Sequence, residues 1–297
     1  MYGSEFYRKG IVMNALEIKN ISKTYKNFKL DDVSFVLPCG HIMGLIGENG
    51  AGKSTIINCI LDIIEKDSGS ISVLGQKNDK NNVSLKENIG VVLDASEVYD
   101  NYTVKQVENI MKDVYKQWNH EVYDYYIQKF ALPLNKMIKD FSRGMKMKMA
   151  ITIALSHQPK LLILDEATSG LDPIMRDEIL DVFMEFVQDE NHAILLSSHI
   201  SSDLEKIADY IAFIHEGKLI LSTSKDELIY EYGLMKCRND EFDMIDKEDI
   251  IRYRIKTYEV EILVKDREKM AKKYPNCIVD PTKLDDIMML YVKGEQI

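Results

Sequence analysis

The chain has 297 residues, with 38 basic and 48 acidic side chains and a formal net charge of −10. This length allows one large domain or two of modest size, and the acidic balance argues against a broad electrostatic attraction to nucleic acid or to an anionic membrane surface. The four cysteines (Cys39, Cys59, Cys237 and Cys277) form neither a CxxC pair nor a spacing typical of disulfides, which favours a reduced cytosolic compartment and no metal cluster. No apolar run approaches the ~18 residues of a membrane-spanning helix.

Residues 1–12 contain no apolar core of a signal peptide, and a regular pattern begins only after Met13. We interpret this stretch as an extra N-terminal segment. It is either an irregular arm or the product of a start assigned upstream of Met13.

From residue 16 to 37 short apolar runs are broken by polar residues, which predicts hairpins of a half-exposed antiparallel sheet. Residues 42–47 then predict a buried strand, and residues 53–64 have helical spacing directly after it. Helical patterns dominate from 102 to 155, so we expect a helical subdomain at about 100–155.

Strands and helices alternate further along the chain. Residues 161–165 and 193–198 predict strands, 173–187 predict a helix, and a hairpin is expected near residues 210–222 with Glu216 and Gly217 in its turn. This alternation is typical of a largely parallel sheet covered by helices.

After about residue 224 the pattern is weaker and more charged. Helices are predicted near residues 226–233, 266–274 and 283–294, and a strand near 258–264. We therefore expect a small α/β accessory domain at 224–297.

The glycine-rich stretch Gly47–Thr55, GENGAGKST, matches the pattern G-x-x-x-x-G-K-[ST] between a predicted strand and a predicted helix. In that context the backbone N–H groups of the loop and the helix N-terminus surround phosphate oxygens, and Lys53 reaches the β and γ oxygens. Ser54 offers its hydroxyl to Mg²⁺. A glycine turn that only connects strand and helix would not need the lysine.

The segment LLILDEATSGLD, residues 161–172, places two acids at the end of a buried strand. Ligands bind at the carboxyl ends of strands in open α/β sheets, so Asp165 is expected to hold Mg²⁺ through water and Glu166 to polarise an attacking water. Two solvated carboxylates at a strand end are the plain alternative, which the neighbouring glycine loop disfavours.

With these motifs the chain resembles the ATP-binding cassette ATPases, the nucleotide-binding subunits of ABC transporters, over about residues 16–223. The resemblance implies an α/β fold: a P-loop NTPase core with a mainly parallel sheet, an N-terminal antiparallel β subdomain and the helical subdomain, together an ATPase domain at 13–223. It also implies that Tyr25 stacks on adenine, that the loop Ser169–Asp172 touches the opposite subunit, and that His199 contacts the γ-phosphate. Taken alone, Tyr25 and His199 would be structural residues.

The stretch FSRGM, residues 141–145, resembles a divergent form of the family's LSGGQ signature. Ser142 is predicted to be the N-cap of a helix whose N-terminus faces an anion. In the family that anion is the nucleotide of a second cassette packed head to tail. Arg143 replaces a usual glycine and Met145 a usual glutamine, whereas Ser142 and Gly144 keep the cap and one permissive backbone position.

Asp94 stands where the family usually has a glutamine that meets Mg²⁺ and water. An ionised aspartate can coordinate the metal but cannot donate a hydrogen bond. We expect retained coupling to the membrane subunit with slower hydrolysis.

The resemblance implies an ATP-hydrolysing subunit, with Mg²⁺, that dimerises on two nucleotides with an identical or paralogous cassette and drives a separate membrane-spanning permease subunit. It would lie in the cytoplasm, peripheral to the inner face of the cell membrane, and bind no nucleic acid. The rival is a soluble ATPase of the same family that acts in translation or DNA repair; the single cassette and negative charge disfavour it.

The predicted catalytic residues are Lys53, Asp94, Glu166 and His199, and the predicted metal ligands are Ser54, Asp94 and Asp165. The predicted nucleotide-binding residues are Tyr25, Gly47, Glu48, Asn49, Gly50, Ala51, Gly52, Lys53, Ser54, Thr55, Ser142, Arg143, Gly144 and Asp172.

Overall fold

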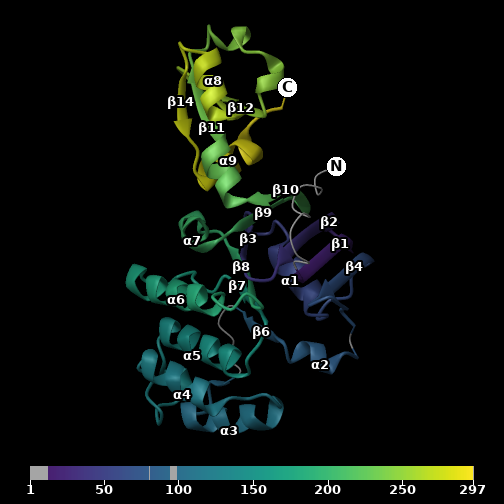
Figure 1. The fold of residues 1–297 in the computed structure, drawn as a ribbon, viewed down its shortest axis with the longest axis vertical. Helices are drawn as coiled ribbons and strands as arrows, with labels where there is room; N and C mark the ends of the chain where they lie inside the picture. Colours follow the sequence, from purple (N-terminus) through teal and green to yellow (C-terminus); the bar gives the residue numbers. More distant parts are fainter. Residues whose placement is uncertain (1–12, 80, 94–98, 297) are drawn as a thin grey trace.

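A computed structural model of the protein describes residues 13–79, 81–93 and 99–296. The predicted extra segment at 1–12 and Asp94 lie outside the described residues. The described residues form three sheets with helices packed around them (Figure 1), so the predicted α/β class is confirmed.

The N-terminal sheet is antiparallel, as expected. It contains β1 (Asn14–Tyr25), β2 (Phe28–Pro38), β4 (Ser68–Val73) and β5 (Gln76–Lys77) in the order β2-β1-β4-β5. Alternate side chains such as those of Leu16 and Ile18 are buried, which is the pattern of a sheet with one covered face.

The central sheet has the order β10-β9-β3-β8-β7-β6. Its strands are β3 (Ile42–Ile46), β6 (Ile89–Val92), β7 (Leu161–Asp165), β8 (Ala193–Ser198), β9 (Tyr210–His215) and β10 (Lys218–Ser224). All neighbours are parallel except β9 and β10, which form the predicted hairpin through Glu216 and Gly217, both with positive φ. The parallel strands β3, β7 and β8 end at one edge of the sheet, where the two acids were predicted.

Helices cover both faces of the central sheet, which explains why β3, β6 and β7 are almost entirely apolar. On one face α1 (Lys53–Ile60) shares a core with the N-terminal sheet. On the other face lie α5 (Arg143–Ser156), α6 (Pro173–Phe186) and α7 (Ser201–Ile207). The short helix α2 (Val83–Lys86) precedes β6.

The predicted helical region contains α3 (Val104–Val114), α4 (His120–Lys129), a 3₁₀ turn at Ile138–Asp140, and α5. These elements lie together at one end of the long axis of the molecule (Figure 1). Thr103 and Gln106 form a capping box at the start of α3, a feature that fixes where a helix begins.

The C-terminal sheet lies at the opposite end (Figure 1) and is antiparallel, in the order β12-β13-β11-β14. Its elements are β11 (Tyr232–Cys237), β12 (Arg252–Ile255), β13 (Val260–Lys265), α8 (Arg267–Lys273), β14 (Ile278–Pro281) and α9 (Leu284–Lys293), with 3₁₀ turns at Phe242–Met244 and Lys247–Asp249. The strand near 258–264 and the last two helices were predicted. The helix expected at 226–233 is wrong in extent, because only a π-helical turn at Glu227–Glu231 forms before β11 begins.

The C-terminal elements share a hydrophobic core with the central sheet. The ring of Tyr291 on α9 meets that of Phe213 on β9 edge-on at 6.1 Å, and the carboxylate of Glu205 on α7 accepts a hydrogen bond of 2.8 Å from the backbone N–H of Leu284. β10 ends at Ser224, one residue past the predicted end of the ATPase domain at 223. The accessory domain at 224–297 stays a prediction, and part of its core is shared with the central sheet.

Candidate functional site

The glycine loop joins β3 to α1 and is shaped by close backbone contacts. A Cβ atom at Gly47 would lie 2.3 Å from the carbonyl oxygen of Ile214 on the neighbouring strand. Gly50 and Gly52 have φ of +84° and +116°, a region that side chains rarely adopt. Glycine is therefore required at these positions for the loop to turn into α1.

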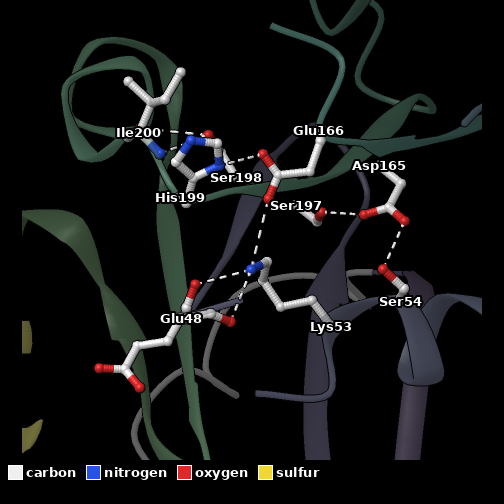
Figure 2. A network of polar contacts seen from close by, with 10 residues as sticks. Glu48, Lys53, Ser54, Asp165, Glu166, Ser197, Ser198, His199 and Ile200 are labelled. Carbon is white, nitrogen blue, oxygen red and sulfur yellow. Dashed lines mark hydrogen bonds and ion pairs between the residues drawn. The ribbon is translucent and has the colours of Figure 1, made fainter. Parts of the chain in front are cut away.

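Lys53, the first residue of α1, is almost completely buried, with 5% of its surface exposed. Its Nζ donates hydrogen bonds to the backbone oxygens of Gly47 (2.8 Å) and Glu48 (3.2 Å), and lies 3.5 Å from Oε1 of Glu166 (Figure 2). The backbone carbonyls of the loop thus hold the ammonium group of Lys53 in place.

Asp165 ends β7 and is held between two hydroxyl groups (Figure 2). Ser54 Oγ donates to its Oδ2 at 2.9 Å, and Ser197 Oγ, from the neighbouring strand β8, donates to its Oδ1 at 2.5 Å. The two residues predicted to bind a metal, Ser54 and Asp165, are therefore in direct contact. Ser197 was missed because only the pairing of β7 with β8 reveals it.

Glu166 follows β7 with a positive φ of 55°, and its N–H donates to the carbonyl of Ser197 at 3.1 Å. Its Oε2 accepts a hydrogen bond of 2.6 Å from Nδ1 of His199, which lies just beyond β8. Its Oε1 is buried without a hydrogen-bond partner and faces Lys53. One oxygen is thus fixed by the histidine, while the other has accepting capacity left.

A cavity of about 210 Å³ opens beside these groups. Its lining residues are Phe28, Glu48, Asn49, Gly50, Gly52, Lys53, Ser54, Thr55 and Glu166. Most of the predicted phosphate loop therefore lines one cavity, whereas Ala51 is buried and not part of its lining.

The aromatic residue of the β1–β2 hairpin that lines this cavity is Phe28. Phe28 lines the cavity, and its ring would contact a Cβ at Gly52 at 2.9 Å. Tyr25 is 40% exposed and does not line the cavity, but its ring centroid is 6.3 Å from that of Phe28. Stacking of Tyr25 on adenine stays a prediction.

The signature residues lie outside the lining of this cavity. Ser142 is the N-cap of α5, as predicted, and its hydroxyl accepts from the N–H of Met145 at 3.3 Å. At Gly144 a Cβ would overlap the side chain of Met175 on α6, and at Gly170 a Cβ would lie 2.8 Å from the guanidinium of Arg143. The first turn of α5 is thus packed against the loop and helix that follow Glu166.

Asp172 caps α6, because its carboxylate accepts hydrogen bonds from the N–H groups of Ile174 and Met175. The structure gives it this local role, and its predicted contact with nucleotide stays untested.

Arg176 connects the loop at Ser169–Asp172 to the segment that carries His199. Its guanidinium donates to the carbonyl of Leu171 at 3.2 Å and lies 3.8 Å from the carboxylate of Asp203, in the first turn of α7. Asp203 is only 3% exposed, and burial raises the pKa of its carboxyl group. Sequence patterns did not single out this pair, because each residue sits in an ordinary helical segment.

Within the described residues, no group of three or more His, Cys, Asp or Glu side chains could hold a metal ion by itself. The Ser54 and Asp165 oxygens would therefore need ligands from a bound molecule or water to complete a metal site. None of the helices in the described part of the chain has the length and apolar character needed to span a bilayer.

Comparison with known proteins agrees with this geometry. The family model described as "ABC transporter" matches residues 30–169. The lantibiotic transport ATP-binding protein SrtF of Streptococcus pyogenes is 37% identical over 71% of this chain and 91% of its own length. The uncharacterized ABC transporter ATP-binding protein YhcH of Bacillus subtilis is 29% identical over 85% of this chain and 93% of its own length.

Among solved structures, an ATP-binding subunit of an ABC transporter superposes with a TM-score of 0.66, at 29% identity, over 72% of this chain and 91% of that one. The resemblance inferred from the motifs is confirmed by these matches. The chain therefore belongs to the ATP-binding cassette family, as the ATP-binding ATPase subunit of an ABC transporter.

Proposed function

We propose that the cavity beside the glycine loop holds the phosphates of MgATP, and that hydrolysis there is coupled to dimerisation with a second cassette. The observation that carries the proposal is the position of Lys53. Among the described residues it is the one lysine or arginine that is buried, and burying a cation is costly unless an anion compensates it. Here the compensating groups are two backbone carbonyls and Glu166, all at the cavity wall.

Binding of a triphosphate changes the partner of Lys53. Its Nζ lies 3.5 Å from Glu166, longer than a charge-assisted hydrogen bond of about 2.8 Å. Phosphate oxygens are better placed acceptors, so the ammonium would leave Glu166 for the ligand. The carboxylate is then free to accept a hydrogen bond from water.

The residues fit a magnesium ion. Hard oxygen ligands and retained waters are what Mg²⁺ prefers, and the Ser54 hydroxyl and the Asp165 carboxylate supply such oxygens in contact with each other. Ser197 orients the carboxylate from the other side. The ion would neutralise charge on the phosphate oxygens.

Glu166 and His199 would together orient the attacking water. His199 holds Oε2 of the carboxylate, which leaves Oε1, now opposite Lys53, as an acceptor once the ammonium group turns to the ligand. A water held there is oriented toward the ligand, and phosphoryl transfer is catalysed mainly by such positioning and by charge stabilisation.

A second chain completes the site in this proposal. The N-terminus of α5 carries exposed Ser142 and Arg143 and lies outside the cavity lining of its own chain. A helix N-terminus with a free backbone dipole and an adjacent arginine favours an anion. Head-to-tail packing brings that end of one chain to the nucleotide of the other, in a homodimer or with a related cassette.

The proposed membrane partner and location are supported by the names of relatives. Relatives include proteins named for lantibiotic and bacitracin transport, which supports coupling to a permease at the inner face of the cell membrane over a role in translation or DNA repair. The described helices include none that spans a bilayer, so the permease would be a separate subunit.

The test is the ATPase activity of the purified chain as a function of its own concentration. A composite site predicts that activity per chain rises with protein concentration, and that Lys53→Ala abolishes it at every concentration. Lys53→Arg, which keeps the charge, is the control for folding. Activity per chain that is constant from dilute to concentrated protein would contradict the composite site.

A further inference from the structure

Two cysteines that are far apart in the sequence meet in the C-terminal sheet. The antiparallel pairing of β11 with β14 sets Leu234 opposite Asp280, Met235 opposite Val279 and Lys236 opposite Ile278. Continued by one residue, this register sets Cys237, the last residue of β11, opposite Cys277, which directly precedes β14.

Both side chains lie on the same face of the sheet. Alternation along a strand puts Cys237 on the side of Met235 and Cys277 on the side of Val279. All four residues belong to or pack against one hydrophobic cluster of the C-terminal unit. The two thiols therefore share an apolar environment on one face of the sheet.

The backbone geometry suits a bond between them. Pro281, opposite Gly233, has no N–H to exchange, and the N–H of Cys277 donates to the carbonyl of Tyr274 at 3.0 Å. Both facts indicate that Gly233, Met235 and Cys237 exchange no backbone hydrogen bonds with the residues opposite them. Such pairs have Cα atoms about 4.5 Å apart, at the short end of the range of about 4.4 to 6.8 Å that a disulfide spans.

We propose that Cys237 and Cys277 form a dithiol that a low-molecular-weight disulfide oxidises to an intrachain disulfide between β11 and β14. Cys39 follows β2 and Cys59 lies on α1, both in another core cluster, so they provide internal comparisons.

The reaction is thiol–disulfide exchange in two steps. Cys277 is half-buried and Cys237 is buried, so the Cys277 sulfur loses its proton to solvent and attacks one sulfur of the small disulfide, which releases one small thiol. The Cys237 sulfur, also deprotonated, then attacks Cys277 Sγ and releases the second. Two protein thiols are oxidised, one small disulfide is reduced to two thiols, and the protons end on those thiols.

The environment makes this bond slow to form and hard to reduce. Burial raises the pKa of Cys237 to about 11 and also raises the pKa of Cys277. Since the thiolate is the nucleophile, both thiols react slowly near neutral pH. Thiols of high pKa are also poor leaving groups, so the disulfide resists exchange once it is closed.

The bond would restrain the strand that leads into α9. It closes a loop that contains β12, β13 and α8, and α9 follows β14 after two residues. Oxidation therefore fixes both strands next to the helix that packs on α7, and it raises the temperature at which the C-terminal unit unfolds.

The test uses the folded full-length chain and oxidised glutathione at mildly alkaline pH. After exchange, free thiols are alkylated and peptides are identified by mass spectrometry without reduction. The proposal predicts one linked pair, Cys237 with Cys277, a loss of two hydrogens from the intact chain, and a melting temperature several degrees higher than that of the reduced protein. Cys237→Ser should stop the reaction at a glutathione adduct on Cys277, whereas Cys39→Ser and Cys59→Ser should leave the linked pair unchanged.

Three results would overturn the proposal. One is four free thiols at every ratio of oxidised to reduced glutathione. Another is a linked pair that includes Cys39 or Cys59, or that joins two chains. The third is equal formation of the Cys237–Cys277 bond in denaturant, which would show that the folded register contributes nothing. None of these outcomes depends on ATPase activity, so the test is independent of the proposed function.

Discussion

Replacement of Glu166 by Gln separates nucleotide binding from hydrolysis. In the structure Oε1 of Glu166 lies 3.5 Å from Nζ of Lys53, and both side chains are largely buried. At an effective dielectric constant of about 20 the gross attraction of such a pair is about 5 kcal/mol, and desolvation offsets most of it. The amide removes this competitor for Lys53 and also removes a negative charge beside the phosphates.

We therefore expect Glu166→Gln to bind ATP with unchanged to about tenfold higher affinity, equivalent to at most about 1.4 kcal/mol. Turnover should fall by about 10² to 10⁴, the usual loss when a general base is removed. The assays are equilibrium titration with ATP and a single-turnover hydrolysis measurement on the same preparation. Weaker binding with turnover close to that of the wild-type chain would refute the assignment of both Lys53 and Glu166.

Five further substitutions test the site residue by residue. Lys53→Ala should weaken ATP binding by about 30-fold or more, since losing one partner of a buried charge pair costs about 2 to 5 kcal/mol; wild-type affinity in a calorimetric titration would rule out this nucleotide site. Ser197→Ala should lower Mg²⁺ affinity of the ATP-bound chain by about tenfold, because groups that orient a metal ligand contribute at this level; an unchanged Mg²⁺ dependence of ATPase would show that Asp165 needs no such support. Tyr25→Ala should weaken ATP but not inorganic triphosphate, whereas Phe28→Ala should weaken both, and the reverse pattern in competition binding would exchange their roles. Asp94→Gln should raise basal ATPase and lower Mg²⁺ affinity, and superimposable curves of turnover against Mg²⁺ would mean that Asp94 plays no part at the metal.

Local motifs predicted the phosphate loop and the two acids because their geometry is short-range. The turn of Gly47–Thr55 is set by its own glycines, and the position of Asp165 and Glu166 follows from the end of one buried strand. The N-cap of α5 at Ser142 was also predictable, since capping depends on residues within one turn.

Contacts between distant segments were not predictable in the same way. Ser197 reaches Asp165 through the pairing of β7 with β8, and Phe28 reaches the cavity through the fold of the β1–β2 hairpin. The C-terminal strands β11, β12 and β14 were missed because each has six residues or fewer. β11 and β14 also pair with each other across β12, β13 and α8, which lie between them in the sequence. The same long-range register brings Cys237 to Cys277, which sequence spacing does not reveal.

The measurement that tests the central claim most directly is the mass of the Glu166→Gln chain by light scattering, with and without saturating MgATP. Two nucleotides closed between two cassettes predict a change from 34.2 kDa to about twice that value when MgATP is added. Adding Ser142→Glu to the same variant places a negative charge at the N-terminus of α5, so we expect this double variant to bind ATP but to stay a monomer. A Glu166→Gln chain that remains monomeric in saturating MgATP, or a double variant that dimerises equally well, would contradict the composite nucleotide site.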